Sequence, residues 1–89
     1  MDYDKERTEK RGRFLRINLM HIGRGIRSLR KINSMTLDDL SVDTGIDTGY
    51  LSRLENGKCK PRIDTLSNIL IVFNLTLKEF YDYLDSLMG

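Results

Sequence analysis

The chain has 89 residues, enough for one compact domain, and its hydrophobic content of 39% suits a chain that builds one core rather than a disordered one. No apolar run approaches the length of a membrane-spanning helix, the charged N-terminus lacks a signal-peptide core, and the single cysteine cannot form an internal disulfide. These features argue against a membrane protein or a disulfide-rich secreted protein and predict a cytoplasmic location.

Positive charge is concentrated in the N-terminal third of the chain. Residues 1–31 contain ten lysines and arginines against four acidic residues, whereas residues 32–89 contain five against nine. This asymmetry favours a basic arm that meets a polyanion, with an ordinary solvated helix face as the alternative. We place the arm at residues 1–21, expect it to be partly helical, and place a single domain at residues 22–89.

The first helix of the domain is predicted at residues 22–32. Apolar residues recur between positions 15 and 29 at spacings of four and three, the pattern of one helix face: Leu15, Leu19, Ile22, Ile26 and Leu29. The stripe also fits one longer helix from about residue 13. Gly23 and Gly25 each weaken such a helix by roughly 1 kcal/mol relative to alanine, so a break near Gly23 is the alternative.

Four further helices are predicted at residues 37–44, 48–56, 63–73 and 77–87. Thr36, Asp47 and Thr76 precede helical patterns as N-cap residues, and Gly45 and Gly57 follow helices as C-terminal residues. The stretch 63–73 is the most apolar and predicts the central buried helix. Because no stretch alternates for long with the period of a strand, the sequence predicts an all-α bundle of five helices.

The predicted helix 48–56 has two chemically different faces. At about 100° per residue, one side is apolar and carries Tyr50, Leu51 and Leu54. The other side is small and polar, with one arginine: Thr48, Gly49, Ser52, Arg53 and Asn56. A helix that exposes such a face is suited to reading polar groups, and the major groove of a DNA duplex is the leading candidate.

A helix-turn-helix pattern covers about residues 22–84. Small Ser41 precedes Gly45 by four residues, and the apolar residues after it have the spacing that packs one helix across another. The segments that carry the pattern are Ile22-Gly23, Ile26-Arg27, Leu29-Arg30, Thr36-Leu37, Leu40-Ser41, Gly45-Ile46, Leu51-Ser52-Arg53-Leu54-Glu55-Asn56-Gly57-Lys58 and Pro61. In these residues the chain resembles the lambda-repressor-like domain of the Cro/C1 or XRE type. The resemblance implies a five-helix domain that binds operator DNA, usually as a dimer.

The resemblance also implies roles for individual residues. The positions that face bases in relatives match Thr48, Gly49, Ser52 and Arg53. The positions near phosphates match Thr36, Asn56, Lys58, Lys60 and Arg62. Tyr50 is also predicted to contact a phosphate. Arg30 and Glu55 match a buried ion pair that ties the first helix to the recognition helix.

The side chains differ in how well they suit base reading. Arg53 can present two parallel N–H groups to guanine O6 and N7, and Thr48 can offer a methyl group to thymine or a hydroxyl to a base or phosphate. Gly49 departs from the amide or hydroxyl side chain usual at its position. Gly49 either lets the DNA approach the helix backbone more closely, or Tyr50 or the arm supplies the contact that its missing side chain cannot make.

Two segments keep alternative interpretations. Phe14, Leu15 and Leu19 could pack on the body of the domain or on a second subunit, while the basic residues of the arm could lie along DNA. The last helix carries more apolar residues than a thin terminal helix normally buries: Phe80, Tyr81, Leu84, Leu87 and Met88. Part of this surface is a dimer contact, or else all of it packs internally.

The sequence therefore predicts a sequence-specific regulator of transcription, with a repressor as the favoured form. Its predicted partners are an operator in double-stranded DNA and a second copy of the chain, with no membrane and no small-molecule ligand. His21 is the only histidine and Cys59 the only cysteine, and no nucleophile with its base is visible, so no metal, cofactor or enzymatic activity is expected. The alternative function is a protein-interaction module, such as an antitoxin-like or anti-repressor partner.

Overall fold

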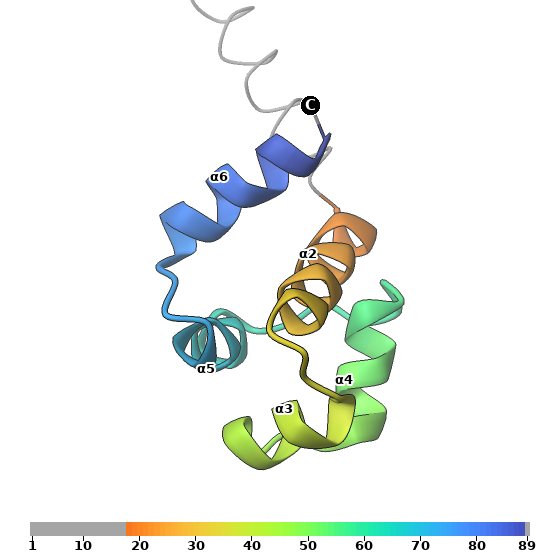
Figure 1. Ribbon diagram of the computed structural model, residues 1–89. Coiled ribbons are helices and arrows are strands. Elements are labelled where there is room, and N and C mark those ends of the chain that lie inside the picture. Colours follow the sequence, from red (N-terminus) through yellow and green to blue (C-terminus); the bar gives the residue numbers. More distant parts are fainter. Residues whose placement is uncertain (1–17, 89) are drawn as a thin grey trace, which may run out of the picture.

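The computed structural model describes residues 18–88, and these residues form five helices and no strand (Figure 1). The helices are α2 (Leu19–Ile32), α3 (Leu37–Thr44), α4 (Thr48–Glu55), α5 (Ile63–Val72) and α6 (Leu77–Met88). This arrangement confirms the predicted all-α, five-helix fold. Most of the predicted basic arm lies outside the described residues, as does its predicted partly helical character.

Helix α2 begins at Leu19, three residues before the predicted position. The side chain of Asn18 accepts hydrogen bonds from the backbone N–H groups of Met20 and His21, at 3.0 and 3.2 Å. In return, His21 Nδ1 accepts the backbone N–H of Asn18 at 3.2 Å. This reciprocal cap fixes the start of the helix. The predicted boundary between arm and domain, at residue 22, consequently falls inside α2.

Helix α2 runs without a break through both of its glycines, which lie where neighbouring helices approach most closely. A Cβ atom on Gly23 would stand 2.3 Å from the carbonyl oxygen of Leu54 in α4. One on Gly25 would stand 2.3 Å from the side chain of Leu84 in α6. Two residues along a helix turn by about 200°, so the two glycines face opposite sides. Figure 1 shows the result, with α2 lying between α4 and α6.

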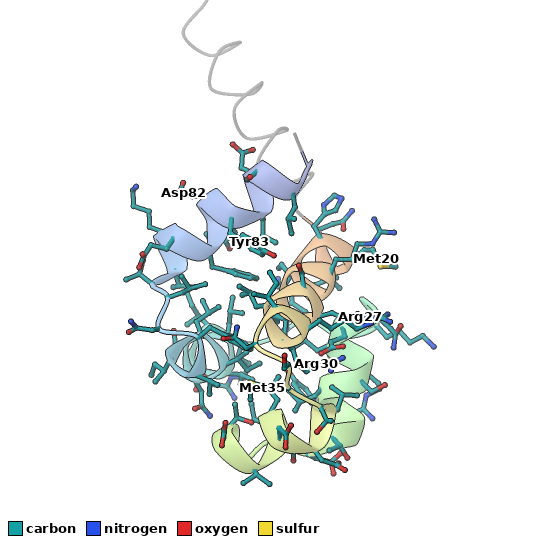
Figure 2. All side chains as sticks on the ribbon, viewed as in Figure 1. Met20, Arg27, Arg30, Met35, Asp82 and Tyr83 are labelled. Atoms are coloured by element: carbon teal, nitrogen blue, oxygen red, sulfur yellow. The ribbon has the colours of Figure 1, made fainter. Side chains whose placement is uncertain are left out.

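The hydrophobic core draws on all five helices. Its buried members are Ile26, Leu29, Leu40, Leu51, Leu54, Leu66, Ile69, Leu70, Phe80 and Leu84. The hydroxyls of Ser28 in α2 and Tyr83 in α6 also form a hydrogen bond of 2.6 Å, and Figure 2 shows Tyr83 pointing from α6 towards α2. Helix α6 is therefore held to the body by both apolar and polar contacts.

The last helix divides its apolar residues between the interior and the surface. Phe80 and Leu84 are fully buried, and Tyr81 is half-buried, whereas Leu87 is 51% exposed. Internal packing thus accounts for the first two turns of α6, and its C-terminal turn offers apolar surface to solvent.

Candidate nucleic-acid interface

Helices α3 and α4 are joined by a turn of three residues that is fixed by glycine. Gly45 has a φ of 72°, a left-handed conformation that a residue without Cβ adopts without strain. Its N–H donates to the carbonyl of Ser41 at 2.8 Å, which ends α3. The chain then turns at Ile46, and Asp47 caps α4 by accepting the N–H of Tyr50 at 3.2 Å.

Side-chain hydrogen bonds hold this turn in one geometry. The hydroxyl of Ser41 donates to the carbonyl of Ile46. The hydroxyl of Thr44 donates to the carbonyl of Leu40 at 2.7 Å and accepts the N–H of Ile46 at 3.2 Å. From α5, the amide of Asn68 donates to the carbonyl of Thr44 at 3.0 Å. Because these bonds satisfy the polar groups of the turn, the angle between α3 and α4 is rigidly set.

Helix α4 presents a buried face and an open face. Leu51 and Leu54 are fully buried. The open face carries the four predicted base-reading residues, of which Gly49 and Arg53 are exposed and Thr48 and Ser52 are half-buried. The structure therefore brings these four residues together on one side of a short helix.

Arg53 is positioned by the aromatic ring of Tyr50. The guanidinium carbon lies 5.9 Å from the ring centre, within the range of a cation–π contact. Tyr50 is half-buried against the core, and burial, followed by the neighbouring Cys59, raises the pKa of its hydroxyl, which stays protonated at neutral pH. The apolar and polar faces are thus less separate than the sequence predicted, since residues three apart on a helix are neighbours.

Gly49 leaves an open surface next to Arg53. A Cβ atom there would lie 2.8 Å from Asp47 Oδ2 and 4.0 Å from Arg53 Nη1. A partner could therefore approach the backbone of α4 closely at Gly49 while it contacts the guanidinium of Arg53.

A buried ion pair holds α4 against α2. Arg30 Nε and Nη2 donate to the two carboxylate oxygens of Glu55 at 2.7 and 3.0 Å, and the two side chains are only 11% and 6% exposed. Arg30 Nη1 donates to the carbonyl of Met35, at 2.8 Å, in the loop before α3. Figure 2 shows Arg30 reaching from α2 towards Met35. This group, called here the Arg30 clamp, joins α2, α4 and the start of α3.

The family resemblance implied the Arg30–Glu55 pair, but the sequence analysis missed two other contributors. The carbonyl of Met35 completes the clamp, and the amide of Asn68 holds the turn. A backbone carbonyl carries no residue-type signal, so the role of Met35 could not be read from the sequence. Asn68 lies in the middle of an apolar helix, and that polar interruption was the available signal.

The predicted phosphate-contacting residues lie at helix ends and in the loop after α4. Thr36 caps α3, and Asn56 Nδ2 donates to the carbonyl of Ser52 at 2.8 Å, so both already have intramolecular partners. Lys58 and Lys60 are exposed. Arg62 is also exposed, with a loose 3.9 Å contact to Asp64, and contacts of that kind hold a side chain only weakly.

The cap of α3 should be sensitive to acid. Asp39 accepts the N–H of Thr36 at 2.8 Å, and this bond, followed by the bond to the Thr36 hydroxyl, lowers the pKa of Asp39 below its ordinary value of 3.8. A lowered pKa means that the stabilisation is present above pH 3.8 and is lost as the pH falls through the folded-state pKa. An NMR titration of the Thr36 amide should show this step. Asp39→Asn should abolish it, and a step that persists in the variant would contradict the assignment.

The five-helix architecture, the fixed turn between α3 and α4 and the open polar face of α4 define a helix-turn-helix domain. Comparison with known families agrees, since a helix-turn-helix family model matches residues 26–80. The chain belongs to this Cro/C1-type family, whose members are DNA-binding regulators.

A curated relative is the HTH-type transcriptional regulator SlrR of Bacillus subtilis (strain 168), which is 32% identical over 62 residues. The match covers 68% of this chain and 41% of that protein, so the chain corresponds to less than half of its length. No solved structure matches the chain.

Two further findings concern residues 18–88 alone. None of their helices is long and apolar enough to cross a membrane. Their histidine, cysteine and acidic side chains do not gather into a group of three or more suited to a metal ion.

Proposed function

We propose that this domain is a cytoplasmic regulator of transcription, with repression as its mode, and that it binds an operator in double-stranded DNA by placing α4 in the major groove. The observation that supports this most directly is the open face of α4, where exposed Arg53 stands beside exposed Gly49. The groove of B-DNA admits an α-helix, and a guanidinium fits the O6 and N7 edge of guanine. Thr48 and Ser52 supply hydroxyls beside them on the same face.

In this arrangement the phosphate contacts come from residues that surround α4. The N-terminus of α3 at Thr36, the Tyr50 hydroxyl and the end of α4 at Asn56 provide neutral donors. The loop after α4 provides positive charge through Lys58, Lys60 and Arg62. Such contacts fix the domain on the duplex without reading its sequence.

We further propose that two copies bind together, with their α4 helices in successive major grooves about 34 Å apart. Selection of bound sequences from a random pool of duplexes tests this arrangement. A symmetric pair of half-sites is the expected result. Selection of a single unpaired half-site would contradict the proposed dimer, but it would not contradict the proposal that α4 reads the DNA sequence.

Arg53→Ala should reduce the preference of the domain for its selected sequence by about 1–3 kcal/mol, because one two-pronged base contact is removed. The affinity for unrelated duplexes should change much less, because on those duplexes the variant lacks only one electrostatic contact. Titrations of the selected duplex and of a shuffled duplex, at the same salt concentration, measure the difference. An equal loss for both duplexes would assign Arg53 to phosphate instead.

Lys60→Ala should weaken binding to all duplexes alike and reduce the slope of log K against log salt by about 1. Lys78→Ala is the matched control, because Lys78 is also exposed but lies on α6 and contacts Asp82 at 3.4 Å. If the wild-type domain bound no duplex at low salt and captured one stoichiometric protein partner instead, the protein-interaction function would replace this proposal.

A further inference from the structure

An apolar groove runs between the start of α2, the start of α5 and the start of α6. Its volume is about 570 Å³, and its apolar lining includes Leu19, Ile22, Ile63, Leu66 and Leu77. Lys60 and Arg62 stand at its rim, in the loop that leads into α5. We call this feature the α2–α5–α6 groove. It is separate from the open face of α4.

The groove exposes apolar surface that a folded chain gains free energy by covering. Ile63 is 71% exposed at the first position of α5, and it lies beside half-buried Leu19, Ile22 and Leu77. Single exposed apolar residues are ordinary on protein surfaces, but here they line one depression, so an apolar side chain that enters it leaves water and gains free energy. The lining therefore suits an occupant with apolar side chains.

The segment of this chain that ends at the groove has the required composition. Asn18 lines the groove, and residues 1–17 precede it directly. That segment is largely polar, but Phe14, Leu15 and Ile17 form an apolar group immediately before Asn18. Four residues of extended chain span at most about 14 Å, so Phe14 can reach the groove in the same molecule.

We propose that Phe14 and Leu15 fill the α2–α5–α6 groove of their own chain. The short connection makes the docking intramolecular, and the effective concentration of such a tethered segment is far above that of a free partner. The docked segment also carries Arg13 and Arg16, and the rim of the groove carries Lys60 and Arg62. If the proposed function is right, this enlarges the positive surface next to the duplex, but the docking itself does not depend on DNA binding.

A tryptophan at position 14 tests the docking, because the natural chain contains none. In the 89-residue Phe14→Trp protein, the emission should be blue-shifted relative to the urea-unfolded protein, and acrylamide should quench it weakly. Adding Ile63→Gln should move the emission towards that of the unfolded protein. Ile63 is mostly exposed, so this second change should leave the circular dichroism unchanged.

Ile71→Gln is the matched control. Ile71 is 73% exposed on the same helix but does not line the groove, so the emission of the introduced tryptophan should stay blue-shifted when this change is added. Emission that is solvent-exposed in the parent Phe14→Trp protein would overturn the proposal. A blue shift that disappears on dilution would also overturn it, and would assign the groove to a second copy. No DNA is present, so failure here is distinct from failure of the proposed function.

Discussion

Arg30→Met should lower the free energy of unfolding by about 3–5 kcal/mol, because it leaves the carboxylate of Glu55 buried without a charged partner. The carbonyl of Met35 loses its donor in the same change. Domains of this kind are stable by about 5–15 kcal/mol in total, so the loss removes a large part of the stability. Urea unfolding followed by circular dichroism measures it.

A double-mutant cycle separates the pair from its surroundings. Arg30→Met combined with Glu55→Leu should recover most of the stability, since well-packed apolar residues often replace a buried ion pair at little cost. Arg24→Met, on the exposed side of the same helix, should change stability by less than about 0.5 kcal/mol. Additive effects of the two single changes would show that the residues do not act as a pair.

The contribution of the Arg30 clamp should persist across the physiological pH range. Glu55 raises the pKa of Arg30 above its ordinary value, outweighing the effect of burial. A raised pKa in the folded state means that the stabilisation is fully present below the unfolded-state pKa and is lost only in strong alkali. The clamp is therefore a constant structural element and not a pH switch.

Gly23→Ala should destabilise the domain by about 3 kcal/mol, the upper part of the range for overpacking, although alanine is the better helix former. The added Cβ would lie 2.3 Å from the carbonyl oxygen of Leu54 and 2.6 Å from that of Glu55. Both are backbone atoms of α4, which cannot rotate away as the end of a flexible side chain can. Either α4 shifts outward or the domain unfolds.

Gly49→Ala is the control for this prediction. Its Cβ would lie 2.8 Å from Asp47 Oδ2, the atom that accepts the Tyr50 N–H, so the cap of α4 must adjust. A lost cap costs typically about 1 kcal/mol and the alanine gains about 1 kcal/mol of helix propensity, so stability should change by less than about 1 kcal/mol. Thermal unfolding of both variants provides the comparison. Equal stability of the Gly23→Ala and wild-type proteins would contradict the close crossing of α2 and α4.

The sequence predicted the helices well because their signals are local. Apolar spacing marks the face that each helix buries, and caps such as Thr36 and glycines such as Gly45 mark the ends. The start of α2 was placed too late because the cap formed by Asn18 and His21 uses a histidine where a glutamate or glutamine is usual. The four residues of the α4 face could be named for a related reason, since helical periodicity alone places them on one side.

What the sequence by itself determined was therefore the all-α class, the faces of the helices and the chemistry available on α4. The tertiary structure alone decided how those helices meet. Gly23 and Gly25 looked like weak points of a helix, yet they are the residues that let α4 and α6 approach α2. Arg53 and Tyr50 were predicted on different faces of α4, yet the guanidinium of Arg53 lies over the ring of Tyr50. The physical reason is that close approaches and shared contacts depend on distances between segments far apart in the chain, which no local pattern records.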